Sequence, residues 1–168
     1  YGEDWEPINL NQVEFDGNGH SITYHVNKEK CNMVHPLFGS VYNSTIKNLN
    51  VQYDFRGQSS SVVANLISRS IVDNVSYSGT VEYDNKHGKA AETFTSYTYF
   101  GVIASYADRS KFNKINISGK IYYSSGYVAT MIGKGYEFVV ANSNVKLDKF
   151  YCSGARCSGL AGDNLSYR

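Results

Sequence analysis

Proline and net charge are both scarce in this chain of 168 residues, which has two prolines and a formal charge of +1. The balance of 16 Lys and Arg against 15 Asp and Glu removes the main electrostatic argument for a nucleic-acid or anionic-membrane partner. Apolar runs all fall short of the roughly 20 residues that a membrane-spanning helix needs. The first residues, Tyr1 to Asp4, are polar and acidic, unlike a signal peptide. We therefore expect a trimmed piece of a longer chain.

The residues that are abundant favour strands and turns. The chain has 15 glycines and 15 tyrosines, with many Asn, Ser and Val. Val and Tyr are enriched in strands, whereas Gly, Asn and Ser are enriched in turns. Helical repeats would instead be rich in Ala, Leu, Glu and Lys. The length predicts one domain that buries about two-thirds of its unfolded surface.

An internal repeat of about 29 residues organises the chain. Pairs of aliphatic or aromatic residues are each closed by a small residue, and these five small residues are Gly39, Ser68, Ala104, Gly133 and Gly162. Their spacings are 29, 36, 29 and 29. The second spacing is seven residues longer than the others, and the polar stretch 84–93 accounts for the extra residues. We expect these five residues to lie in one file and to let the chain turn corners, because small residues, and Gly above all, tolerate tight bends.

Short segments of alternating apolar and polar residues follow each of these positions, as in Leu49-Asn50-Val51 and Ile115-Asn116-Ile117. Period two is the signature of a strand. Two or three strands per repeat predict an all-β fold, a single-stranded parallel β-helix (β-solenoid) of about four to five coils, in which each coil buries its apolar face on the next. A β-sandwich or jelly roll also has many short strands, but it predicts no common register of 29.

The order of several motifs resembles a known family. The motifs are Asp4-Trp5-Glu6-Pro7-Ile8, Phe15-Asp16-Gly17-Asn18-Gly19-His20-Ser21-Ile22, Leu37-Phe38-Gly39 and Ile46-Lys47-Asn48-Leu49-Asn50-Val51. Together they resemble bacterial surface proteins with GLUG repeats, which form right-handed parallel β-helices. Later copies fit the pattern less well. The resemblance implies a cell-surface or secreted stalk or adhesin, and it carries over no catalytic residue.

The expected domain therefore covers 1–168 as one β-solenoid, with a cap-like start at 1–34 and repeats at 35–168. The chain stops six residues after Gly162, within what would be another coil. Because an uncovered solenoid end is an unpaired strand edge, we expect further coils of the parent chain to follow.

Two sets of residues could form an outward binding surface. If Leu49 and Val51 point inward, the polar residues beside them point outward. These polar residues form two files, Asn48, Asn74, Lys114 and Asn142, and Asn50, Ser76, Asn116 and Asn144. The files predict either a hydrogen-bonded Asn ladder or a platform for a glycan or protein partner. Tyr83, Tyr122 and Tyr123 could stack on sugar rings, although strand propensity alone also explains them.

Other candidate positions are fewer. His87 lies in the polar stretch, where it is either a binding residue or a solvated one. Cys152 and Cys157 flank a turn-like segment and could close a disulfide in an oxidising compartment; otherwise they are small buried residues or an exposed thiol. The spacings of Cys and His predict no metal site, and nothing predicts a cofactor.

Catalytic signals are weak. The carboxylates fall at different positions of the repeat, and no serine lies in a G-x-S-x-G motif. We therefore expect a non-catalytic cell-surface or secreted module that acts as a rigid stalk or adhesin and presents a Tyr/Asn-rich face to a host protein or glycan. The alternatives are a carbohydrate-binding module or a degenerate polysaccharide lyase or hydrolase.

Overall fold

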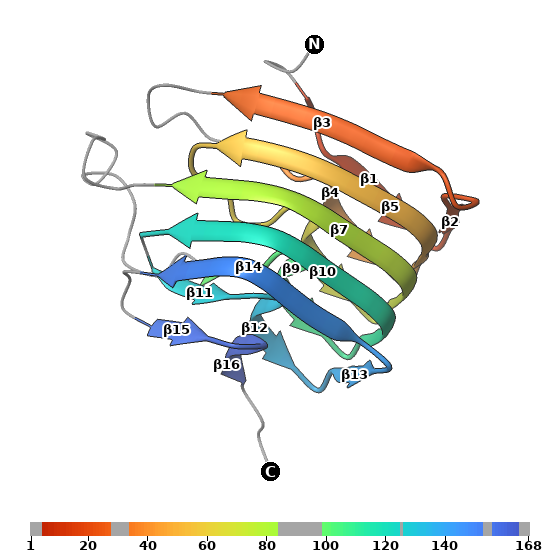
Figure 1. Cartoon of the computed structure of the whole chain (residues 1–168). Coiled ribbons are helices and arrows are strands. Elements are labelled where there is room, and N and C mark those ends of the chain that lie inside the picture. The colour runs from red at the N-terminus through yellow and green to blue at the C-terminus, as the bar shows by residue number, and fades with distance from the viewer. Residues whose placement is uncertain (1–4, 28–33, 84–98, 125, 153–155, 165–168) are drawn as a thin grey trace.

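The computed structural model describes residues 5–27, 34–83, 99–124, 126–152 and 156–164. The described residues contain strands and no helix, and the strands stack in parallel as a β-solenoid of about four turns (Figure 1). This confirms the all-β solenoid predicted from the repeat. No described segment forms a helix long and apolar enough to cross a membrane.

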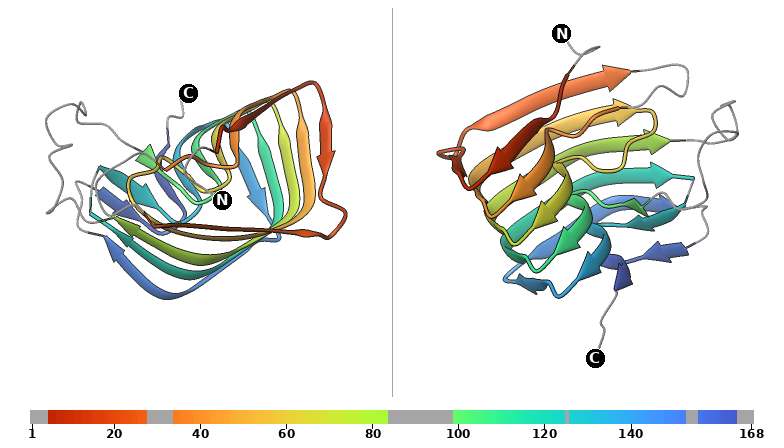
Figure 2. Two further views of the ribbon diagram at one scale, coloured as in Figure 1. Left: turned by 90° about the horizontal axis from the view of Figure 1, so that it is seen from above. Right: turned by 180° about the vertical axis from the view of Figure 1, so that it is seen from behind.

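Three parallel sheets make up the walls of the solenoid (Figures 1 and 2). The front sheet contains β2 (Glu14–Asp16), β3 (Ser21–Asn27), β5 (Thr45–Arg56), β7 (Ile71–Tyr83), β10 (Lys111–Tyr123), β13 (Val139–Ala141) and β14 (Asn144–Cys152). The back sheet contains β1 (Ile8–Asn11), β4 (Phe38–Tyr42), β6 (Ala64–Ser68), β9 (Ala104–Asp108), β12 (Ile132–Tyr136) and β16 (Ala161–Asn164). The third sheet is short and contains β8 (Tyr99–Phe100), β11 (Tyr127–Ala129) and β15 (Arg156–Ser158).

The N-terminal segment is part of the stack. Within 1–34, which was expected to form a cap-like start, β1 pairs with β4, and β2 and β3 pair with β5. The pairing is parallel and extends over all seven residues of β3. Residues 8–27 therefore supply the strands of a coil.

The register differs from the expected alignment at Ser68 and Ala104. Ser68 pairs with Tyr42 and Asp108, so it lies three residues beyond the level of Gly39 at which it was expected. Ala104 pairs with Ala64 and Ile132, one residue before the file of Gly133. Hydrogen-bonded partners on successive coils are 26, then 40, then 28 or 29 residues apart, so one coil is shorter and the next step longer than the sequence spacing indicated.

The remaining three small residues do share a file. The register of the residues on either side places Gly39, Gly133 and Gly162 at the same level of successive strands. Asn65 and Ser105 lie at this level on the strands between them. The corner role expected for these glycines is wrong, because all three lie inside strands and none has positive φ. Close packing is the actual reason for a small residue: a Cβ on Gly133 would lie 2.8 Å from the Ser105 carbonyl oxygen and 2.9 Å from the Phe100 nitrogen.

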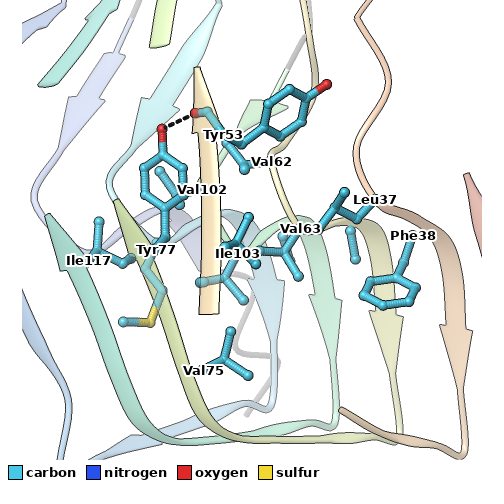
Figure 3. Packing of buried hydrophobic residues seen from close by; sticks show 14 of the residues in the cluster. Leu37, Phe38, Tyr53, Val62, Val63, Val75, Tyr77, Val102, Ile103 and Ile117 are labelled. Carbon is cyan, nitrogen blue, oxygen red and sulfur yellow. Dashed lines mark hydrogen bonds between the residues drawn. The ribbon is translucent and has the colours of Figure 1, made fainter. Parts of the chain in front are cut away.

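The core lies between the front and back sheets. Figure 3 shows aliphatic side chains of the back wall, such as Val63 and Ile103, facing Val75, Tyr77 and Ile117 of the front sheet. The buried aromatic rings keep their hydroxyl groups paired: the Tyr77 hydroxyl donates to the Tyr53 carbonyl at 2.9 Å. Burial raises the pKa of the Tyr53 and Tyr77 hydroxyls well above the usual range, so both remain neutral donors.

Corners between the back and front sheets are built from a repeated pair of residues. The first residue of the pair has a left-handed backbone, and this file is Gln12, Asn43, Arg69, Arg109 and Glu137. The next residue is a buried serine in three coils, Ser44, Ser70 and Ser110. The Ser44 backbone N–H donates to Ser70 Oγ at 3.0 Å, and the Ser70 N–H donates to Ser110 Oγ at 3.1 Å. This serine ladder satisfies backbone groups that the strand pairing leaves open at the bend.

Candidate functional site: the outer face of the front sheet

Alternation along the strands assigns the predicted site residues to opposite faces. Leu49 and Val51 are buried, as expected. Asn50 and Asn116 point outward between apolar neighbours, and Asn144 points outward between Ser143 and Val145. Tyr122 also points outward, where it is half-buried. His87 lies outside the described residues.

The assignment of Tyr83 and Tyr123 to a binding surface is wrong. Tyr123 is fully buried and Tyr83 is 6 % exposed. Each follows a buried aliphatic residue, Val81 or Ile121, by two positions, so period two puts each ring inside the solenoid. The ring centroids of Tyr123 and Phe100 lie 4.4 Å apart in a stacked arrangement. These two tyrosines belong to the core.

Asparagine side chains form a ladder on the upper part of this face. Asn74 Nδ2 donates to Asn48 Oδ1 at 2.9 Å, and Asn48 Nδ2 donates to Asp16 Oδ1 at 3.1 Å. In the neighbouring file, Ser76 Oγ donates to Asn50 Oδ1 at 2.6 Å. The ladder interpretation thus describes both files in the upper coils. In the lower coils, Asn142 Nδ2 donates to Asn113 Oδ1 at 2.8 Å and Asn113 Nδ2 donates to Asp73 Oδ1 at 2.7 Å, whereas Asn116 and Asn144 are exposed.

The same ladder marks a second corner, which the sequence analysis missed. Asn48, Asn74, Lys114 and Asn142 have φ of 52°, 54°, 53° and 51°. Asn is the residue other than Gly that adopts this left-handed region most readily. The recurrence of Asn at one position of the repeat was therefore a conformational signal as well as a polar one.

Lys114 is the exception in this corner file, and this leads to a testable prediction. Replacing Lys114 with Asn should stabilise the protein by about 0.5 to 1 kcal/mol, because Asn adopts the left-handed backbone with less strain and continues the ladder from Asn74. Chemical denaturation measures the change. The control is Lys111→Asn, at an exposed strand position of β10, where the same chemical change should not stabilise. An equal gain at both positions would contradict the corner explanation.

Charged residues on the upper part of the face are paired. Lys47 Nζ lies 2.7 Å from Glu14 Oε1 and 3.5 Å from Asp16 Oδ2. The hydrogen bond to Glu14 raises the pKa of Lys47, while the Asn18 backbone N–H and then Asn48 lower the pKa of Asp16. These groups are therefore charged and engaged with one another at neutral pH.

A shallow hollow lies at the opposite end of β5 from this cluster, over β3, β5 and β7. It is lined by the outward residues His25, Asp54, Arg56, Thr80 and Glu82. Asp54 Oδ1 accepts a 2.6 Å hydrogen bond from the Thr80 backbone N–H, and Arg56 Nε lies 3.9 Å from Glu82 Oε1. Both carboxylates thus have local partners.

The lower part of the face, on β10 and β14, has a different composition. Lys120 pairs in register with Lys149, and Tyr122 pairs in register with Tyr151. Lys149 Nζ lies 5.5 Å from the centroid of the Tyr122 ring, within reach of a cation–π contact. Of these four residues, only Tyr122 was predicted from the sequence. Alternation from the buried Ile121 could have found Lys120, but the bulge that places Lys149 opposite it is a tertiary feature.

Two further features lie at the short third sheet. Cys152 and Cys157 form a disulfide with a Cα–Cα distance of 6.1 Å. The Tyr99 and Tyr127 rings stack 4.9 Å apart, Lys134 Nζ lies 4.8 Å from the Tyr99 centroid, and the Arg156 guanidinium lies 5.3 Å from the Tyr127 centroid. These cations and rings are mutually satisfied and stiffen the wall.

Within the described ranges, no three His, Cys, Asp or Glu residues come together as a metal-binding group would require. Comparisons with protein-family profiles, with curated proteins and with solved structures find no match to this chain.

Proposed function

We propose that this chain is a non-catalytic β-solenoid module of a secreted or cell-surface protein, acting as a rigid stalk or adhesin. The main support is the continuous register of the front strands β3, β5, β7, β10 and β14. Because of this register, their inward side chains form one core and their outward side chains form one polar face. The serine and asparagine ladders bind successive coils at both corners. Such a body transmits force and presents side chains at fixed spacing.

The disulfide supports the location. Disulfides form and persist in oxidising compartments, which include the extracellular space and the bacterial periplasm. Cys157 is exposed and Cys152 is half-buried, so reductants of a cytosol would reach the bond between them. The resemblance to bacterial GLUG-repeat surface proteins favours the same location.

The outer face supports a binding role over a catalytic one. The carboxylates of the upper part are engaged by Lys47, Arg56, the Asn113 amide or backbone N–H groups, so they are occupied in maintaining the coil. General acid–base chemistry on a sugar requires two carboxyl groups that face a common substrate. The host protein or glycan is thus expected to bind across the face without being cleaved.

Two measurements test this function, one on intact producing cells and one on the purified chain. Protease added to intact producing cells should degrade the protein, or the protein should be in the medium, and Cys152 and Cys157 should resist alkylation until reduced. Immobilised glycans and extracellular-matrix proteins should retain the purified chain in a saturable manner, with no new reducing ends released. A reduced, protease-protected protein inside cells would overturn the location, and release of reducing ends would establish the enzyme alternative.

A further inference from the structure

The outer face of the front sheet is divided by charge along the solenoid axis. β7 carries two acidic residues, Asp73 and Glu82, and no Lys or Arg, whereas β10 carries three lysines and no acidic residue. β14 adds Lys146 and Lys149 against one carboxylate, Asp148. The near-neutral total charge thus conceals a net positive charge on β10 and β14, below the net negative charge of β7.

The lysines of the lower face are placed against electrostatic preference. Lys120 and Lys149 are registered neighbours on adjacent parallel strands, about 4.8 Å apart at the backbone. Like charges at opposing positions destabilise a sheet. Within the described part of the chain, neither ammonium forms an ion pair with a carboxylate. Glu82, which is registered with Tyr122 on the coil above, is paired with Arg56.

Aromatic surface lies beside these lysines. Tyr122 and Tyr151 occupy the next outward position on the same two strands, and Tyr151 is 52 % exposed. Their rings are flanked by Lys120 on one strand and by Lys149 on the other. An exposed Tyr ring offers an apolar face to the C–H face of a sugar, while its hydroxyl remains available to water or to a sugar hydroxyl.

We propose that Lys120, Tyr122, Lys149 and Tyr151 form a binding site for an acidic polysaccharide. The lysines supply point charges to carboxylates of the polymer, and the tyrosines pack on the sugar rings between them. The same pair of residues, a lysine and a tyrosine, occurs on both adjacent coils, which matches a polymer whose negative charges recur along its length. This inference rests on the proposed function, because it names the class of ligand for the proposed adhesion role.

A single-stranded nucleic acid, like an acidic polysaccharide, combines negative charges with rings that can stack on tyrosine. Cys152, on the strand that carries Lys149 and Tyr151, forms a disulfide with Cys157, and this bond favours an extracellular polymer. The structure therefore favours the polysaccharide, and the nucleic acid becomes an outcome of the test.

The test uses the full chain and three probes: alginate as a polymer of uronic acids, dextran as a neutral polymer, and oligothymidylate. Binding is measured by calorimetry or by retention on the immobilised polymer. The wild-type chain should bind alginate, with an affinity that falls as salt is added because the lysine charges are screened. Dextran and oligothymidylate should bind more weakly than alginate by about tenfold or more.

Variants locate the site. The double substitution Lys120→Gln with Lys149→Gln, and the single substitution Tyr151→Ala, should each weaken alginate binding by about tenfold or more. Lys111→Gln is the matched control, since Lys111 is an exposed lysine of the same strand at its opposite end. Thermal unfolding of each variant verifies that it is folded.

Four results would overturn the inference. Three of them are a folded wild-type chain that does not bind alginate, equal weakening by the Lys111 control, and binding of oligothymidylate as tight as that of alginate. Retention on a neutral glycan or matrix protein that is insensitive to the Lys120 and Lys149 substitutions would also overturn it, while leaving the proposed adhesion role intact.

Discussion

Replacing Gly119 with alanine is expected to destabilise the protein by about 3 to 5 kcal/mol, which lowers the unfolding midpoint by on the order of 10 °C. Gly119 has φ of +112°, a backbone conformation that residues with a side chain rarely adopt. It is registered with Gly79 on the coil above. An added Cβ would lie inside van der Waals contact of the Gly79 carbonyl and 2.8 Å from the Gly79 nitrogen.

Backbone atoms cannot move aside as a flexible side chain can, so the strain must separate β7 from β10. Gly159→Ala is the matched control, because a Cβ at Gly159 meets no atom within 4 Å. That substitution should change stability by less than about 0.5 kcal/mol. Thermal and chemical unfolding measure both variants. Equal midpoints for the two would show that the strands are not packed at the Gly79–Gly119 contact as described.

Truncation of Tyr123 to alanine is expected to cost about 3 to 5 kcal/mol, since it leaves a cavity in the centre of the core. The ring stacks on Phe100 and lies 5.2 Å from the ring of Tyr83, centroid to centroid. Its hydroxyl donates to the Ser59 carbonyl, and burial raises its pKa above the usual range. Tyr123→Phe should cost less, about 1 to 3 kcal/mol, because only the partner of that carbonyl is lost.

The matched control for Tyr123 is Tyr151→Ala, at an exposed ring of the neighbouring strand. Its stability should remain within about 0.5 kcal/mol of the wild type. Denaturant titration of the three variants gives the order directly. If Tyr123→Ala were as stable as Tyr151→Ala, Tyr123 would be a surface residue, as the sequence analysis had proposed, and its burial would be wrong.

The prediction of inner and outer faces succeeded where it relied on strict alternation. Leu49 and Val51 flank Asn50, and the structure buries the two aliphatic residues and leaves the amide outside. It failed for Tyr123, which was assigned to the same face as Tyr122 although two adjacent strand residues cannot share a face. The buried Ile121 already identified which of the two is inside.

The prediction of register failed for another reason. A coil shorter by a few residues is followed by a longer step, with offsets of 26 and 40 between hydrogen-bonded partners. The buried Val62-Val63-Ala64 segment, and not Leu66-Ile67-Ser68, pairs with the following Val102-Ile103-Ala104. Both segments are apolar with a small final residue, so local composition could not distinguish between them.

The amino-acid sequence alone indicated that this chain stacks parallel coils, because period-two segments at a common interval bury their apolar sides when each coil covers the next. The tertiary structure alone decided which residues meet across coils. The bulge that sets Lys149 opposite Lys120, the backbone contact between Gly79 and Gly119, and the left-handed corners all depend on the exact stagger of adjacent strands. Stagger is fixed by the packing of the whole core, and a slip of one residue would exchange every inward side chain for an outward one.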